Sequence, residues 1–217
     1  MSDIFSLIDP AQRTDGITRA KDSLNRSGLV VMPTDTVYGV AADAFDPTGV
    51  RRLLRAKGRG RNMPIPVLIA SAEVLPALAT GVTVEARELA DAFWPGGLTL
   101  IFRQQSSLSW DLGDSRGTVA MRVPAHDDAL TLLGDTGPLA VSSANTTGLE
   151  APVTVEQAQG MLGDAVEVYL DSGPTPGAVP STIVDATTDI LVVRRQGVVT
   201  VEALRAIVSN LEVAEPD

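Results

Sequence analysis

The chain has 217 residues and a formal net charge of −10 at pH 7, from 27 acidic and 17 basic side chains. Without cysteine it can form no disulfide, thiol nucleophile or thiolate metal site, and its single histidine, His126, leaves no partner for a histidine cluster. A pI near 4.5 argues against broad, non-specific nucleic-acid binding, whereas 44% hydrophobic residues suffice for a sizeable aliphatic core.

The N-terminal part of the sequence predicts a helix followed by a buried strand. Residues 1–12 resemble neither a signal peptide nor a membrane span and are expected to be a loosely structured lead-in to a cytoplasmic protein. Apolar residues at helical spacing predict a helix over Ile17 to Leu24. The apolar run Leu29 to Met32, between Gly28 and Pro33, is typical of a strand that is buried on both faces.

Three short polar residues, Thr34, Asp35 and Thr36, follow this strand directly. They can be a turn or an N-cap cluster and nothing more. In open α/β sheets, however, ligands bind beyond the carboxyl ends of the strands. The position of the three residues therefore makes a substrate-binding ledge a second interpretation.

A local reversal of charge follows in the next helix. Six of the 17 cations, Arg51, Arg52, Arg55, Lys57, Arg59 and Arg61, lie within residues 51–61, and no acid lies between Asp46 and Glu73. The helix predicted over Thr48 to Ala56 places its arginines on a solvated face. Lys57 and Arg59 instead flank Gly58, where the backbone can wrap closely around a ligand, and so indicate a polyanion site.

The middle of the chain alternates predicted strands and helices. Residues 104–117 form a polar connection that contains Trp110 and is expected to be either mobile or ligand-related. Strands are predicted at Val67–Ala70, Leu98–Phe102 and Val119–Val123, and helices at Ala72–Ala79 and Val84–Phe93.

Arg122 interrupts the apolar strand Val119–Val123, and a buried arginine needs an anionic or carbonyl partner. It is either a structural ion pair or a clamp for a ligand carboxylate. His126 is interpreted as a helix-start residue, because no triad partner accompanies it.

The C-terminal half repeats the arrangement of strand and polar ledge, with Ser142 to Gly148 following a strand at Leu139–Val141. Neither a P-loop nor a G-x-G-x-x-G motif occurs, so any nucleotide is bound in another way. With no evident linker, one domain is expected over residues 1–217, with its core at about 13–211 and a frayed acidic tail at 212–217. The remaining predicted elements are a helix at Val155–Leu162, strands at Val166–Leu170, Ser181–Asp185 and Ile190–Val193, and a last helix at Val201–Leu211.

Seven short motifs occur in order along the chain. They are Pro33–Gly39, Lys57–Arg59, Trp94–Leu100, Arg122–Pro124, Ser143–Asn145 with Thr147–Gly148, Ser181–Asp185 and Arg195–Gly197. Together they resemble the YrdC-like family, the threonylcarbamoyl-AMP synthases of tRNA modification. The resemblance implies an α/β fold with an open, twisted mixed sheet flanked by helices.

The resemblance further implies a nucleotidyltransferase that joins L-threonine, bicarbonate or CO2, and ATP into threonylcarbamoyl-adenylate and pyrophosphate. A downstream transferase then moves the threonylcarbamoyl group to tRNA. Thr36, Arg122 and Ser181 would bind threonine, and Lys57 and Arg59 would act in catalysis. The residues implied at the ATP site are Lys57, Arg59, Thr118, Ser143, Asn145 and Arg195. Mg2+ would arrive with ATP, and no protein side chain is assigned to it.

Three departures from the family pattern accompany the resemblance. Leu68 stands where some longer members have a histidine, and Thr147 replaces a serine. The chain ends soon after Arg195, without the C-terminal domain that closes over the nucleotide in the longer members, so we expect either that another element covers ATP or that the product is released more freely. Two alternatives remain, namely a non-catalytic module that binds double-stranded RNA or tRNA and the YrdC-like domain of a carbamoyltransferase, although that class carries cysteine zinc motifs.

Overall fold

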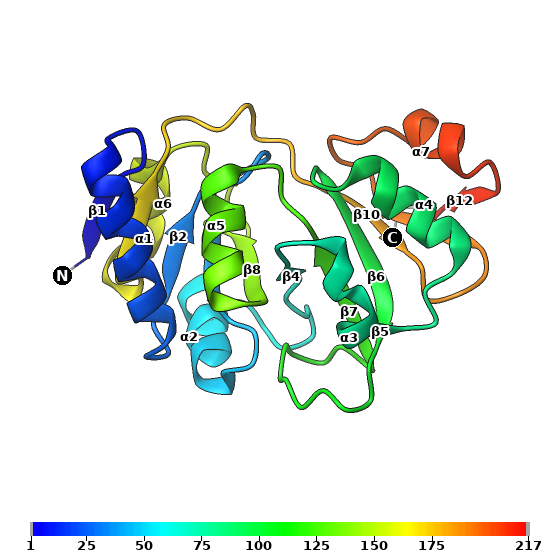
Figure 1. Ribbon diagram of the computed structural model, residues 1–217, viewed down its shortest axis with the longest axis horizontal. Helices are drawn as coiled ribbons and strands as arrows, with labels where there is room; N and C mark the ends of the chain where they lie inside the picture. The colour runs from blue at the N-terminus through cyan, green and yellow to red at the C-terminus, as the bar shows by residue number, and fades with distance from the viewer. Residues whose placement is uncertain (1, 216–217) are drawn as a thin grey trace.

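The computed structural model describes residues 2–215, which build one continuous mixed sheet of twelve strands flanked by seven α-helices (Figure 1). The strand order is β1-β9-β2-β3-β8-β4-β7-β6-β10-β11-β12, with β5 beside β6. This arrangement confirms the predicted α/β class. The strands are β1 (Asp3–Ser6), β2 (Val30–Met32), β3 (Gly39–Asp43), β4 (Val67–Leu68), β5 (Ala79–Thr80), β6 (Leu98–Gln104), β7 (Thr118–Arg122), β8 (Leu139–Ser143), β9 (Val168–Asp171), β10 (Thr182–Asp185), β11 (Leu191–Arg195) and β12 (Leu211–Val213).

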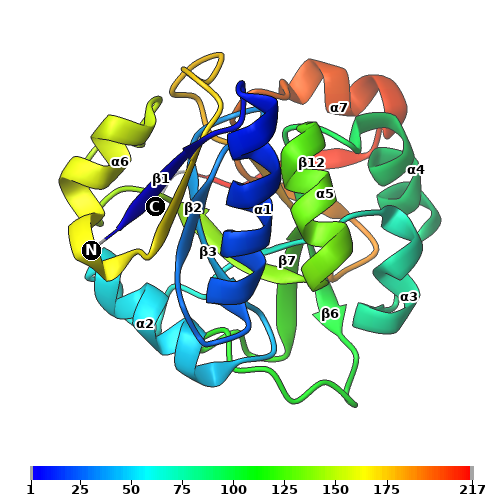
Figure 2. The ribbon, with the colours of Figure 1, turned by 60° about the vertical axis from the view of Figure 1, so that its left-hand side comes forward.

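Helices cover both faces of the part of the sheet that contains β9, β2, β3 and β8. The protein has two clusters of buried hydrophobic residues, one on each face of this part of the sheet. Side chains alternate along β2, so Val30 and Met32 belong to the first cluster and Val31 belongs to the second. Helices α1 (Pro10–Leu24) and α5 (Asp127–Thr136) lie side by side over the first face (Figure 2). Helices α2 (Pro47–Lys57) and α6 (Val155–Leu162) contribute their buried residues to the second cluster.

The other part of the sheet is covered by helices on one face and lines a cavity with the other. Helices α3 (Leu75–Leu78), α4 (Val84–Phe93) and α7 (Val201–Ile207) share a core cluster with the buried residues of β6, β10 and β11. On β6, Leu98 and Leu100 join this cluster, whereas the intervening Thr99 faces the cavity. The alternation of side chains therefore separates core from cavity.

Helix α2 leads directly into the predicted anion site. It begins after Asp46, whose carboxylate accepts hydrogen bonds from the N–H groups of Thr48 and Gly49. It ends at Gly58, which adopts the left-handed conformation (φ 61°). This cap turns the chain so that Arg59 leaves the helix towards the sheet.

The two ends of the chain differ from the expectation. Residues 3–6 form strand β1, which pairs in parallel with β9, and α1 begins at Pro10, so the predicted lead-in and helix start are wrong. The last helix ends at Ile207, not at Leu211, because Leu211–Val213 forms strand β12 beside β11. The predicted tail therefore contains part of a strand, and its last two residues, 216–217, lie outside the described part.

Several interior elements agree with the prediction, whereas strands β3 and β5 were missed, the latter because its first residue was predicted to end a helix over Ala72–Ala79. Helices α4 and α6 have the expected bounds, and His126 occupies the N-cap position of α5, although its side chain makes no capping hydrogen bond. Strand β3 was missed, because its sequence, GVAAD, has too little alternation to indicate a strand. Across residues 2–215, no helix has the length and apolar character needed to cross a membrane.

Candidate active site

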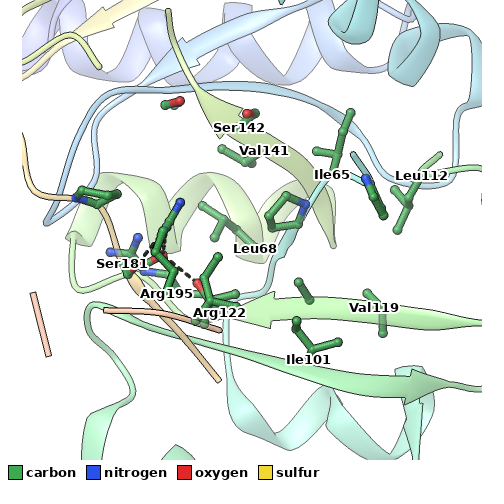
Figure 3. A pocket seen from close by; sticks show the side chains of 18 of the residues that line it. Ile65, Leu68, Ile101, Leu112, Val119, Arg122, Val141, Ser142, Ser181 and Arg195 are labelled. Atoms are coloured by element: carbon green, nitrogen blue, oxygen red, sulfur yellow. Dashed lines mark hydrogen bonds between the residues drawn. The ribbon is translucent and has the colours of Figure 1, made fainter. Parts of the chain in front are cut away.

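A cavity of about 330 Å³ opens where the uncovered face of β6, β7 and β10 meets the ends of β3 and β8. One end carries Arg122, Ser181 and Arg195, and the other is apolar, with Ile65 and Leu112 (Figure 3). Seven of the nine predicted site residues line it, namely Thr36, Arg59, Thr118, Arg122, Ser143, Ser181 and Arg195.

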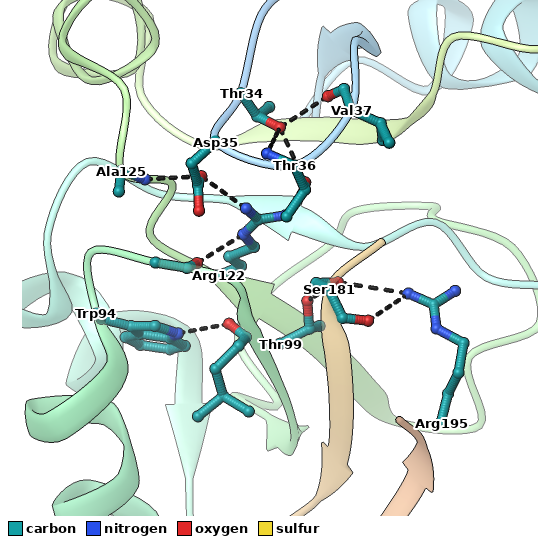
Figure 4. Close-up of polar contacts among 12 residues, drawn as sticks. Thr34, Asp35, Thr36, Val37, Trp94, Thr99, Arg122, Ala125, Ser181 and Arg195 are labelled. Atoms are coloured by element: carbon teal, nitrogen blue, oxygen red, sulfur yellow. Dashed lines mark hydrogen bonds and ion pairs between the residues drawn. The ribbon is translucent and has the colours of Figure 1, made fainter. Parts of the chain in front are cut away.

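Arg122 lies at the polar end with its guanidinium held on three sides (Figure 4). It donates to the carbonyl oxygen of Gly96 at 2.8 Å, to Thr36 Oγ1 at 2.9 Å and to Asp35 Oδ1 at 2.7 Å. The ion pair that the first interpretation predicts is present. Arg122 also lines the cavity, and the carboxylate clamp stays a prediction. A guanidinium has five N–H donors, so two remain for a ligand.

The residues that follow β2, Thr34 to Thr36, hold the Thr36 hydroxyl in place through hydrogen bonds. Thr34 Oγ1 donates to the carbonyl oxygen of Val37 at 2.7 Å and lies 3.0 Å from Thr36 Oγ1. Since the single hydroxyl proton of Thr34 goes to Val37, the proton between the two hydroxyls comes from Thr36, which also accepts from Arg122. The three residues from Thr34 to Thr36 therefore form a hydrogen-bonded support for Arg122, and the interpretation as a simple turn does not account for this.

Ser181 is held between two strands. Its hydroxyl lies 2.9 Å from Thr99 Oγ1, and Arg195 donates to its carbonyl oxygen at 2.7 Å. The neighbouring Thr182 Oγ1 accepts from the N–H of Gly197 at 2.8 Å, which brings the loop after β11 against β10. These contacts place the Ser181 hydroxyl and the Arg195 guanidinium together.

Arg59 reaches the cavity from the loop after α2. It donates to the carbonyl oxygens of Met63 at 2.9 Å and Pro64 at 3.1 Å, and to Ser142 Oγ at 3.0 Å. Its pKa is lowered by burial and, next, by the charge of Arg195. The pKa of Arg195 is lowered in the same way, by burial and by Arg122.

The three arginines of the cavity thus repel one another, and no carboxylate lines the cavity among the described residues. Burial also lowers the pKa of Arg122, which Asp35 partly restores. Such an excess of partly desolvated positive charge favours a polyanionic ligand. Within residues 2–215 no three His, Cys, Asp or Glu side chains come together as a metal site.

Lys57 and Asn145 lie behind the cavity wall and are not brought to its surface. Lys57 is 2% exposed, and its ammonium donates to the carbonyl oxygens of Ser143 at 2.6 Å and Asn145 at 2.7 Å. The side chain of Asn145 in turn donates to the carbonyl oxygen of Leu149 at 2.7 Å. Lys57 was expected on backbone free to wrap around a ligand, but it is the last residue of α2, and it holds the end of β8, which presents Ser142 and Ser143.

The other cations of α2 belong to the surface, with one exception. Arg51 and Arg55 are exposed, as the solvated-face interpretation predicts. Arg52 is half-buried, donates to the carbonyl oxygen of Ser27 at 2.8 Å and pairs with Glu167. It therefore ties α2 to the start of β9 and is more than a solvated charge.

Sequence reasoning missed Thr99 and Ser142 as parts of the site. Thr99 interrupts the apolar stretch Leu98–Phe102, in the same way that Arg122 interrupts its strand, and this signal could have identified it. Ser142 stands beside the predicted Ser143, and only the direction of the strand decides which side chain meets Arg59.

The fold and the cavity define an α/β protein with a positively charged cavity, suited to an anionic ligand, at the ends of its strands. The sequence has neither a P-loop nor a Rossmann glycine motif. Comparison with known proteins agrees. The sequence model of the Sua5/YciO/YrdC family, which bears the description "Telomere recombination", matches residues 22–197. The chain belongs to this family.

Named relatives and a solved structure cover nearly the whole chain. A Mycobacterium tuberculosis protein provisionally named threonylcarbamoyl-AMP synthase is 50% identical over 204 residues, 94% of each chain. The threonylcarbamoyl-AMP synthase of Bacillus subtilis is 34% identical over 98% of this chain and 61% of its own length. Sua5 of Pyrococcus abyssi, solved in complex with L-threonine, superimposes with a TM-score of 0.91 at 32% identity, covering 98% of this chain and 63% of its own.

Proposed function

We propose that this chain is a threonylcarbamoyl-AMP synthase, which joins L-threonine, bicarbonate or CO2, and ATP and releases pyrophosphate. The observation that carries the proposal is a single cavity with an arginine suited to a carboxylate at one end and further cations beside it. Both the family and the named relatives support this activity. The product serves threonylcarbamoyladenosine modification of tRNA.

At the polar end, Arg122, Thr36 and Ser181 bind threonine. The two free N–H groups of Arg122 meet the amino-acid carboxylate, since a guanidinium can bind a carboxylate with two parallel hydrogen bonds. The Thr36 and Ser181 hydroxyls, both buried and fixed by neighbours, orient the rest of the amino acid.

The reaction needs no protein nucleophile. A carbamate oxygen of N-carboxythreonine attacks the α-phosphorus of ATP, the new P–O bond forms, and the bond to pyrophosphate breaks. Catalysis then depends on alignment and on neutralising the leaving pyrophosphate. Arg59 and Arg195, with Thr118 and Ser143, contact the nucleotide.

Lys57 and Asn145 act on the same step by holding the end of β8, which carries Ser143. Magnesium would enter with ATP as part of the substrate, because no carboxylate of residues 2–215 lines the cavity to hold it. Residues 2–215 are proposed to act as one domain.

The experiment that tests the proposal is incubation with ATP, L-threonine and bicarbonate, with pyrophosphate and the adenylate measured together. We expect release to require both co-substrates. Equal release with glycine, or without any amino acid, overturns the assignment, and tight RNA binding without turnover would favour the RNA-binding alternative.

A further inference from the structure

Two loops form the apolar end of the cavity. The loop from 58 to 66 connects α2 to β4 and contributes Pro64 and Ile65, and the loop from 105 to 117 connects β6 to β7 and contributes Leu112 and Ser115. The apolar end of the site therefore keeps its shape only while these loops stay together.

Two backbone hydrogen bonds join the two loops. The N–H of Ile65 donates to the carbonyl oxygen of Leu112 at 2.9 Å, and the N–H of Asp114 donates to that of Arg61 at 2.8 Å. Gly113 has φ 104°, and a Cβ there would lie 2.8 Å from the carbonyl oxygen of Arg61. The approach is so close that only glycine fits at this point.

The Arg61 side chain fastens the same two loops from outside. Its guanidinium forms a two-pronged pair with Asp111, at 3.0 and 2.7 Å, and its Nε lies 3.4 Å from Asp114. Hydrogen bonding by Asp111 raises the pKa of Arg61, and hydrogen bonding by Arg61 lowers that of Asp111. We call Arg61, Asp111 and Asp114 the clasp.

The carboxylate side of the clasp is fixed to the body of the molecule. Trp110, directly before Asp111, is 9% exposed and stacks on Phe45 with ring centroids 5.3 Å apart. Its indole N–H donates to Gln104 Oε1 at 3.0 Å. Asp111 is thus a rigid anchor, and the loop from 58 to 66 is the part that it holds.

That loop also orients the arginine that faces the cavity. Arg59 takes its direction from the carbonyl oxygens of Met63 and Pro64, which lie two and three residues beyond Arg61. A loop released from Asp111 would carry these two carbonyl groups with it. Arg61 is therefore linked through the backbone to the direction of the Arg59 guanidinium.

We propose that Arg61 and Asp111 are positioning residues for nucleotide binding: by clasping the two loops they fix Arg59 and close the apolar end of the cavity. The inference rests on the proposed function for the identity of the nucleotide.

The test compares Arg61→Ala and Asp111→Ala with Arg19→Ala, which breaks the Arg19–Asp3 pair. The control is matched, because both arginine side chains are 49% exposed and the Asp3 pair lies on β1. We expect each clasp variant to raise the KM for ATP by about 5-fold, with kcat, the KM for threonine and the melting temperature nearly unchanged. The double variant should be no worse than Arg61→Ala, because Arg61→Ala already removes the contact with Asp111 as well as that with Asp114.

Calorimetric titration with ATP keeps this test separate from the reaction itself. If the wild type binds ATP without turnover, the proposed function fails, yet the clasp is still tested by the affinities of the variants. An ATP affinity and KM in Arg61→Ala equal to those of Arg19→Ala would overturn the inference. Parallel losses for ATP, threonine and melting temperature would also overturn it, since they indicate a general structural role.

Discussion

Arg122 and Asp35 show how one residue can serve structure and ligand together. The pair is largely buried, with side-chain exposures of 7% and 19%, and the carboxylate also accepts from the N–H of Ala125 at 2.9 Å. Burying a guanidinium is costly unless its donors are satisfied. Asp35 therefore holds Arg122 in place and leaves two donors directed elsewhere.

Replacement of Arg122 by Lys tests the clamp. Lys keeps the charge but loses the planar fork, so we expect L-threonine to bind at least ~10-fold more weakly, about 1.4 kcal/mol, with little change in ATP affinity. Calorimetry with each ligand, alongside the melting temperature, measures this. A variant that melts far lower yet binds threonine normally would assign Arg122 to the core alone.

Lys57 is a cation whose hydrogen-bond partners are carbonyl oxygens of Ser143 and Asn145, and within residues 2–215 no carboxylate pairs with it. Burial, and then the charge of Arg59, lowers its pKa to about 8 from an ordinary 10.5. The folded state thus releases this proton at a lower pH than the unfolded state does. Its contribution to stability accordingly rises as the pH increases from about 8 towards 10.5.

We expect the free energy of unfolding of the wild type, relative to Lys57→Met, to increase by about 1 kcal/mol between pH 8 and pH 9. Urea denaturation of the two proteins at each pH measures the difference, and groups common to both cancel. A constant difference would mean that Lys57 titrates as an exposed lysine does.

At the scale of elements, the loop after β11 matters because it lies almost against the end of β10. A Cβ on Gly197 would lie 2.1 Å from the carbonyl oxygen of Pro180 and 2.5 Å from the carbonyl carbon of Ser181. Both neighbours are backbone atoms and cannot rotate away. The site residues Ser181 and Arg195 flank this contact on their respective strands.

Gly197→Ala should therefore separate β10 from the loop, lower the melting temperature and weaken threonine binding by at least ~10-fold, about 1.4 kcal/mol. Gly160→Ala is the matched control, because nothing lies within 4 Å of a Cβ there and alanine favours the helix α6 by about 0.5–1 kcal/mol. Differential scanning calorimetry separates the two. Equal behaviour would show that the contact at Gly197 relaxes freely.

Sequence patterns predicted the elements whose stabilising contacts are made by residues close together in the sequence. Helix α4 was defined by its apolar spacing and by the following Trp-Pro-Gly-Gly stop, and α6 by its own periodicity. Strands β1 and β12 were missed because each depends on pairing with a distant partner, β9 or β11. Short edge strands carry too few residues for a period to stand out.

The residues of the site could likewise be predicted where the signal is local in the sequence, and not where it depends on distant contacts. Arg122 could be identified, because a charge in an apolar strand is conspicuous, and the ledges could be placed at strand ends. The resemblance supplied Thr118 and Arg195, and the residues themselves did not. The burial of Lys57 could not be predicted, because its partners are carbonyl oxygens some ninety residues further along, which no side-chain pattern reveals.

At the scale of the whole molecule, the protein has a net charge of −10, yet three arginines, Arg59, Arg122 and Arg195, line its cavity. The arginines lower one another's pKa values, so the unliganded protein holds repulsion that an anion would relieve. Exposed charges beyond a Debye length, about 10 Å at 0.1 M salt, contribute little to this local field.

Inorganic tripolyphosphate should consequently raise the melting temperature by several degrees at low ionic strength, with a smaller rise in 0.5 M NaCl. The rise should be much reduced in Arg59→Ala and unchanged in Arg51→Ala, whose side chain lies on the exposed face of α2. Thermal shift measurements compare the three proteins. An identical rise in all three would assign the effect to a diffuse basic surface.

Strand β4 gives the molecule a mechanical property. It has only two residues, Val67 and Leu68, which pair with β7 on one side and with β8 on the other, and in the described part of the chain it is the strand that joins the two parts of the sheet. The ladder between β3 and β8 has five residue pairs. The ladders on the two sides of β4 have two residue pairs each, as does that between β2 and β9, so few backbone hydrogen bonds resist bending at β4.

The cavity spans this narrow point, with Thr36 and Ser143 on one side and Arg122 and Ser181 on the other. Arg122 also crosses this point through its contacts with Thr36 and Asp35, so these contacts limit any rotation about β4. The two walls of the cavity are thus joined by a two-residue strand and by one buried arginine, and a substrate that binds Arg122 acts directly on the joint between them.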